Sequence, residues 1–498
     1  MIFKYFKNVF VLSILLLGVV SSYSQKREIT YEAQVMSQFS DKGTMPFWLV
    51  SNKYGIIPNE NSGVVNLRIY SDSHVNKQGL KFNYGTSIIG SQGGESEVFI
   101  DELYASAIWN GVSVDLGMQH RDVKFDGLSA TNGDLLYSGN ARMYPELKFQ
   151  LKEFLPVAFT NKWLWVKGSF SNGIMYDDRY VNHTNVHHKN AFLRIGKQDG
   201  LSFTIGLDHY AQWGGTSPVW GDLGGFDAFV DAVFVRGGKV LVDENGNESI
   251  TESYNKSGNH IGQNMFEFSY STSKIESVLS FKNMYEDKSG DFKHLNKVKD
   301  WNMSFFLKFK ESKLISSFIY EYYYTKDQGG YSIRPNHPIE PVIGFDGYFS
   351  NGVFRSGWTN HQRIIGLPLF TPSLNDGMVS GITNNAIVAH HFGITGFIGK
   401  LKYKTLLTFS ENYGQALLVN DGQGNQEENY SKSYTHPDGL SQQSYLVELI
   451  FPKWKKFPFE VSTSIALDQG KYLEENVGFQ IKLLKKGIIT GKKRLTSK

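Results

Sequence analysis

The chain has 498 residues, of which 41% are hydrophobic, 20% charged and 14% aromatic. After the first twenty residues it contains no apolar run of the ~20 residues that a transmembrane helix needs, which excludes a helical membrane protein. A membrane β-barrel is not excluded, because barrel strands need apolar side chains only at alternate positions. The 50 glycines, 27 tyrosines and 36 phenylalanines favour β structure.

Charge and cysteine content restrict the partners. Lysine and arginine total 51 and aspartate and glutamate 48, a net charge of +3, so we expect no nucleic-acid partner. The absence of cysteine excludes disulfides, thiolate metal sites and the acylated cysteine of a lipoprotein. Contact with membrane lipid must therefore come from the fold itself. Nothing in the sequence indicates an oligomeric state.

Residues 1–24 have the organisation of a secretory signal peptide. Lys4 and Lys7 precede an apolar stretch over residues 9–20, and a small-residue pattern ends at Ser24. An uncleaved anchor is the alternative, but the apolar stretch is too short to span a bilayer. We therefore expect cleavage after Ser24 and export of the mature chain.

From Val64 onward, stretches that alternate apolar and polar residues recur between turn residues. The clearest runs from Leu201 to Trp213 and has one apolar and one polar face, as a strand between two different media would. Residues 303–309, 401–410 and 457–468 alternate in the same way. Many such runs are about ten residues or longer, whereas strands of soluble proteins average about five or six, so their length favours a membrane barrel.

These runs predict an all-β fold, a transmembrane antiparallel barrel formed by residues 25–498 as a single domain. Between 17 and 20 strands are plausible in the printed sequence, and an even number near 18 is preferred because both termini of such barrels lie on the periplasmic side. An exported β-sandwich or propeller is the alternative, but it would require a polar outer face. Long charged side chains on the polar faces indicate a filled lumen, for example Lys308, Lys402, Lys404 and Glu460.

One segment departs from the strand pattern. Apolar residues of the stretch 226–235 recur with the spacing of an amphipathic helix. We expect a short helix there, on the periplasmic side of the barrel.

Enzyme and metal motifs do not occur in a complete form. The sequence lacks the serine elbow G-x-S-x-G, the zinc pair H-E-x-x-H and a complete phosphate loop, so we expect no enzyme, no cofactor and no metal site. His187-His188 and His390-His391 could suggest a metal, but neighbouring residues of a strand point to opposite faces. Each pair would place only one imidazole in the lumen.

Several blocks of the sequence are similar to a known family. Leu128 to Gly133, Ser138 to Arg142 and Tyr144 to Glu146 resemble a signature of the capsule assembly Wzi family of outer-membrane proteins. The resemblance extends from about residue 31 to residue 485 through further blocks at 186–196, 206–215, 357–370 and 384–391. The chain departs from the family pattern at Ala386, where the family often has arginine.

The resemblance implies a closed barrel of about eighteen strands with short helical elements on the periplasmic side. It also implies a non-enzymatic, lectin-like role in the outer membrane of a Gram-negative cell, where exported capsular polysaccharide would be held at the surface. An outer-membrane channel or transporter for a polar solute or glycan is the alternative, and it would need an open lumen. An outer-membrane hydrolase is a third reading, and it would need a serine and a histidine in catalytic geometry.

Glycans are bound by aromatic rings and by planar polar or charged side chains. The resembling blocks supply the candidate polysaccharide-binding residues Arg142, Lys189, Asp208, Tyr210, Gln212, Trp358 and His361. The alternative role for each is mutual hydrogen bonding that fills and stiffens the lumen. His209 belongs by alternation to the lipid-facing set, so we expect either a bulge that returns it to the lumen or a strand that has already left the membrane.

Overall fold

The computed structural model describes ten ranges of the chain, and the predicted signal peptide, residues 1–24, lies outside them. The described ranges are 28–75, 79–93, 96–197, 199–237, 240–248, 256–286, 299–328, 347–420, 430–454 and 456–490.

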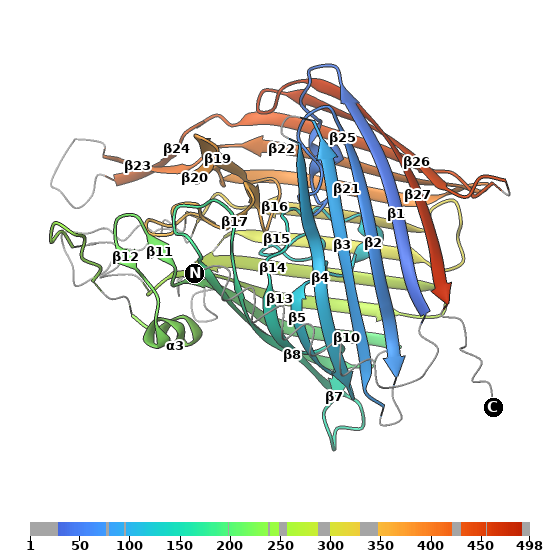
Figure 1. Cartoon of the computed structure of the whole chain (residues 1–498), viewed down its shortest axis with the longest axis horizontal. Helices are drawn as coiled ribbons and strands as arrows, with labels where there is room; N and C mark the ends of the chain where they lie inside the picture. The colour runs from blue at the N-terminus through green and yellow to red at the C-terminus, as the bar shows by residue number, and fades with distance from the viewer. Residues whose placement is uncertain are drawn as a thin grey trace, which may run out of the picture.

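These residues form a closed antiparallel β-barrel, as the sequence predicts (Figure 1). Each strand pairs with the next strand of the barrel, and the first, β1, closes it by pairing with the last, β27. The sheet has 19 strands, but the two-residue β7 and the longer β6 both pair with β8, which leaves 18 positions around the barrel.

The barrel strands are β1 (Glu28–Ser40), β2 (Ser62–Val75), β3 (Lys81–Gln92), β4 (Glu97–Trp109), β5 (Val112–Met118), β6 (Glu146–Leu151), β7 (Leu155–Pro156), β8 (Leu164–Ile174), β9 (Asn185–Gly196), β10 (Gly200–Trp213), β13 (Asn259–Ser271), β14 (Ile275–Glu286), β15 (Trp301–Phe309), β16 (Ser317–Tyr324), β21 (Ile387–Ile398), β22 (Leu401–Asn412), β25 (Leu440–Ile450), β26 (Glu460–Gly470) and β27 (Asn476–Thr490). Outside the barrel, the part of the chain that the structure describes forms four hairpins, made of β11 (Thr216–Ser217) with β12 (Gly221–Asp222), β17 (Thr359–Asn360) with β18 (Arg363–Ile364), β19 (Thr371–Asn375) with β20 (Met378–Asn384), and β23 (Ala416–Asn420) with β24 (Tyr430–Tyr434).

The strands have an apolar outer face and a polar inner face. On β10, Leu201 is 66% exposed whereas Thr204 and Asp208 are at most 4% exposed. The exposed apolar side chains of β2, Leu67 and Ile69, repeat this arrangement. An apolar exterior around a polar interior suits a barrel surrounded by lipid.

The two ends of the barrel differ. Glu28 at the start of β1 pairs with Thr490 at the end of β27, so both ends of the barrel sheet lie together. At this end, which we call the short-turn end, two or three residues join several strand pairs, at 110–111, 272–274 and 399–400. At the opposite, long-loop end the connections include residues 41–61, 119–145, 214–258 and 325–386. In outer-membrane barrels short turns face the periplasm and long loops face outward.

The helices of the described residues are α2 (Phe47–Val50), the 3-10 helix η1 (Phe125–Gly127) and α3 (Phe226–Phe234). The helix predicted at 226–235 is therefore present, but its expected periplasmic placement does not hold. Nine barrel positions precede α3, and an odd number of crossings puts it at the end opposite the start of β1 and the end of β27 (Figure 1). The other two helices also belong to long-loop connections. None of the described helices has the length and apolar character to cross a membrane.

Three long-loop segments fold into the barrel and fill it. Residues 119–145 contact the wall through Asp126, which lies 2.8 Å from Lys308 of β15, and through the carbonyl of Leu128, which lies 2.8 Å from His391 Nε2 of β21. Residues 347–370 pack on that segment, since Ser138 N donates to the carbonyl of Ile365. Residues 41–61 bring α2 into the interior, where Trp48 Nε1 donates to Thr408.

The filled lumen agrees with the expectation drawn from the charged inner faces. Lys404 pairs with Glu448 across the inner surface at 2.6 Å. Half of the large fully buried side chains belong to the inserted segments, namely Leu49, Leu128, Leu136, Tyr348, Phe349 and Trp358.

Candidate functional site

Four of the seven candidate residues meet inside the barrel. Asp208, Tyr210 and Gln212 alternate along the inner face of β10, and Trp358 comes from the inserted segment 347–370. The Tyr210 and Trp358 ring centroids are 5.1 Å apart. All four residues are at most 4% exposed.

Internal partners hold each of these four side chains. Asp208 Oδ1 lies 2.7 Å from His188 Nε2, and the Tyr210 hydroxyl accepts from Arg121 at 2.6 Å. Trp358 Nε1 donates to the carbonyl of Leu136 at 2.6 Å. Gln212 Nε2 donates to the carbonyl of Gly357 at 3.0 Å, and its Oε1 accepts from Asn259 at 2.7 Å. The hydrogen bonds of Tyr210 and Gln212 hold the inserted segments against the barrel wall, and the hydrogen bond of Trp358 joins two of these segments.

Lys189 lies on the other side of the wall. Its ammonium group donates to the carbonyl of Val233 at the end of α3. The same helix places Phe229 against Trp213, with ring centroids 5.4 Å apart. Lys189 and Trp213 face outward on β9 and β10, so α3 covers this part of the outer surface near the rim.

His209 also faces outward, and β10 pairs with both neighbours without a bulge. It is 4% exposed, and its Nε2 lies 3.1 Å from His260 Nδ1. Of the two expected solutions the bulge is therefore wrong, and His209 is accommodated by protein cover at the rim. In each of the pairs His187-His188 and His390-His391 alternation predicts one inward-facing imidazole, and His188 and His391 are the two that contact the interior.

The remaining two candidates, Arg142 and His361, line a pocket of about 260 Å³ at the long-loop end. Arg142 lies 3.6 Å from the centre of the Phe99 ring and makes a bidentate pair with Glu97, at 2.7 and 2.5 Å. His361 packs edge to face on Tyr176. Burial is the main factor that lowers the pKa of His361, and the charge of Arg142 adds to it, so the imidazole is neutral at pH 7.

The hairpin of β17 and β18 presents His361 to this pocket. Asn360 pairs with Arg363, which leaves His361 and Gln362 as the turn residues. Both have positive φ, 46° and 63°, as the tight primed turns of hairpins require. Histidine is found in this conformation more often than most residues, but glutamine is not, so the turn carries backbone strain at Gln362, and such strain is often found at binding sites.

Two further pocket residues were not predicted from the sequence. Arg363 Nη2 donates to the carbonyl of Ile57 and to Asn59 Oδ1, both at 2.8 Å. Burial lowers the pKa of Arg363 to about 10, with a further contribution from the charge of Arg142. Gln362 lines the same pocket. Their position directly after His361 was the available signal, but only the hairpin geometry turns all three residues toward one space.

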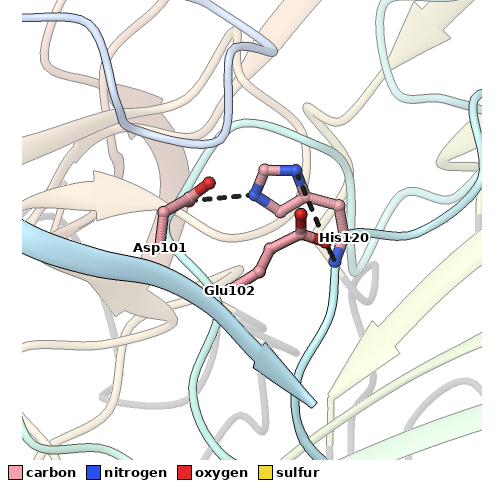
Figure 2. Close-up of side chains that lie close together, drawn as sticks. All are labelled: Asp101, Glu102 and His120. Carbon is pink, nitrogen blue, oxygen red and sulfur yellow. Dashed lines mark hydrogen bonds and ion pairs between the residues drawn. The ribbon is translucent and has the colours of Figure 1, made fainter. Parts of the chain in front are cut away.

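Asp101, Glu102 and His120 form a cluster of two carboxylates and a histidine (Figure 2). Asp101 and Glu102 are neighbours on β4, yet both are buried because a one-residue register shift against β3 lets both side chains face inward. His120 Nε2 lies 2.9 Å from Asp101, and the His120 backbone N–H donates to Glu102 at 2.9 Å. Arg68 Nε lies 2.6 Å from Glu102.

The ligand atoms of these three residues lie within 4.8 Å of one another, which is close enough to share a metal ion. Here, however, Arg68 balances the charge of Glu102 and His120 binds both carboxylates, so the cluster is satisfied internally. The Tyr54 ring stacks on His120 with centroids 3.7 Å apart, and burial raises the pKa of Tyr54 to about 12. Gly55, the next residue, accepts from Arg142 Nε at 3.3 Å. The cluster thus supports the pocket floor through Tyr54.

The closed antiparallel barrel has the fold of an outer-membrane protein whose structure is solved. It is similar to Wzi of Escherichia coli, an outer-membrane protein involved in group 1 capsule assembly that is described as a carbohydrate-binding β-barrel. That likeness has a TM-score of 0.51 at 10% identity, over 91% of this chain and 83% of that chain.

Two barrels of Pseudomonas aeruginosa are less similar. OprD gives a TM-score of 0.46 at 9% identity, over 94% of this chain and 96% of that one. OccK3 gives 0.44 at 9% identity, over 93% and 96%. No protein-family model matches the chain, and no curated protein sequence matches it significantly. The likeness to Wzi supports the β-barrel fold, while the outer-membrane location and membership of the Wzi family stay predictions.

Proposed function

We propose that this protein is a non-enzymatic member of the capsule assembly Wzi family, which binds exported capsular polysaccharide and retains it at the outer surface of the cell. The observation that carries the proposal is the pocket at the long-loop end, where Arg142, His361, Gln362 and Arg363 present planar polar groups. Half-exposed Tyr176 beside His361 adds a ring on which a sugar can stack. The resemblance of the sequence blocks and the likeness to a carbohydrate-binding barrel agree with this role.

The filled lumen favours retention over diffusion through the barrel. Inserted segments 41–61, 119–145 and 347–370 contact the wall and one another by hydrogen bonds along the described interior. A diffusion channel would require a continuous water-filled path instead.

A cell experiment tests retention. Deleting the gene should increase the polysaccharide released into the medium without lowering total synthesis, and the wild-type protein should restore attachment. Complementation with a variant in which Arg142 and His361 are both alanine should fail to restore it, provided that the variant shows the heat-modifiable migration of a folded barrel. Unchanged attachment after deletion would refute the proposal.

Conductance measurements in planar bilayers test the alternative. The wild-type protein should give no steady stepwise current. Large regular steps would indicate an open channel and would contradict the interpretation of the inserted segments as a plug.

A further inference from the structure

Arg363 is a half-buried cation whose hydrogen-bonding partners are neutral. It donates to a backbone carbonyl and to the side-chain oxygen of Asn59. Within the described part of the chain, no carboxylate lies within 4.0 Å of its guanidinium group. A partly desolvated positive charge without a counter-ion is costly, so an anion that entered the pocket would be stabilised there.

The other charged residues that line the pocket do not act as a counter-ion for Arg363. Glu97 is already engaged by Arg142 through two hydrogen bonds. Glu60 is exposed and makes no ion pair with Arg363. The pocket therefore holds one guanidinium group that is free to pair with an anion from outside, and a planar guanidinium matches a carboxylate in geometry.

We propose that this pocket binds the carboxylate of an acidic sugar, such as a uronic acid unit of the polysaccharide, and that Arg363 is its counter-ion. This inference rests on the proposed function and adds the chemical class of the ligand. The volume of about 260 Å³ lies just below the ~300 Å³ at which small-molecule sites begin, which suits a single sugar unit. Gln362, beside Arg363, donates through its amide nitrogen to the carbonyl of Gly377 at 2.7 Å, and its Oε1 can accept from a sugar hydroxyl group.

The test compares two forms of one ligand. Purified wild-type protein in detergent is titrated with the native acidic capsular polysaccharide and with the same polysaccharide after its carboxyl groups have been reduced to alcohols. We expect reduction to weaken binding about tenfold to a hundredfold, the range for loss of one charge-assisted interaction. Equal binding of both forms would overturn the inference and leave polysaccharide binding intact. Binding of neither form would overturn both proposals.

Variants of the pocket residues give a second test, because some should weaken binding of the polysaccharide and one should strengthen it. Arg363→Gln should weaken binding of the native polysaccharide about tenfold or more, and Arg363→Lys should recover part of it. Glu60→Gln removes a competing negative charge from the lining and should strengthen binding a few-fold. Arg236→Gln, which removes an exposed guanidinium at the same end of the barrel outside the pocket, is the matched control and should change nothing.

A structural role of Arg363 alone would not produce this pattern. If Arg363→Gln only disturbed the hairpin, binding of the native and the carboxyl-reduced polysaccharide would fall together. If the charge pairs with the ligand, only the native form is affected. Loss of binding to both forms by a folded Arg363→Gln variant would overturn the assignment of Arg363 as counter-ion.

Discussion

Glu321 fastens the 119–145 segment to the barrel wall, and its removal should loosen the plug. Glu321 is 1% exposed on β16. Its Oε1 accepts from Ser129 Oγ at 2.7 Å, and its Oε2 accepts from the Ala130 N–H at 2.7 Å and from the Tyr323 hydroxyl at 2.8 Å. Glu321→Ala removes all three interactions and leaves buried donors without an acceptor.

A hydrogen bond to a charged group contributes about 1.5–3 kcal/mol, so three would sum to roughly 4–9 kcal/mol. Interactions within one network are not additive and water can enter the vacated space, so we expect a loss near the lower end, about 4 kcal/mol. Folding into lipid vesicles as a function of urea concentration measures this loss. Glu153→Ala, which alters an exposed glutamate in a short-turn connection, is the control and should be neutral.

The same variant should change conductance. In a planar bilayer, Glu321→Ala should give intermittent current steps that the wild-type protein lacks, because the segment leaves its position for part of the time. A variant that is as stable as wild type and equally silent would refute the idea that this carboxylate holds the plug.

Three further predictions concern the rim and the interior. Phe229→Asp should detach α3 from Trp213, and the detachment should speed proteolysis within residues 214–258. An unchanged cleavage rate would mean that the contact between Phe229 and Trp213 does not hold the helix. Gln212→Ala removes the acceptor of the Asn259 amide and one of the donors to the Gly357 carbonyl, and it should lower stability by about 1–3 kcal/mol in the same vesicle assay. An equally stable variant would contradict the anchoring role of Gln212. Burial raises the pKa of Asp300 to about 7, so the folded state favours the protonated carboxyl, and the free energy of unfolding should fall as the pH rises from about 4 to about 7. Asp300→Asn should abolish this dependence of stability on pH. If the dependence persists in the variant, another group is responsible for it.

The strand pattern could be predicted because it is local. Alternation has a period of two residues, so Thr204 and Asp208 on one face and Leu201 on the other already separate interior from exterior on β10. The spacing within 226–234 likewise predicted a helix. The end of the barrel at which the helix lies depends on how many strands precede it, and a short segment does not contain that information.

Only part of the candidate site could be predicted from the sequence. Arg142 and His361 were named as candidates, but Arg363 was not, because its approach to the pocket depends on two consecutive residues of positive φ. Asp101 and Glu102 were missed for a related reason. A single-residue register shift makes two adjacent side chains face the same way, contrary to the alternation on which the strand prediction depends.

The insertion of residues 119–145 into the lumen also could not be predicted from local sequence patterns. The partners that hold this segment, such as Gln263 on β13 and Glu321 on β16, are more than a hundred residues away in the chain. Their hydrogen bonds with Leu135 and Ser129 join parts of the chain that are far apart in sequence and adjacent in the folded barrel. The charged inner faces predicted that something fills the lumen, and the structure identifies the segments.

The most direct test of the central claim is equilibrium binding of the capsular polysaccharide of the producing bacterium to the purified, folded barrel. We predict saturable binding by the wild-type protein and its loss when Arg142 and His361 are both replaced by alanine, in a variant that keeps heat-modifiable migration. Absence of saturable binding by the wild-type protein, or equal binding by the folded double variant, would contradict the account.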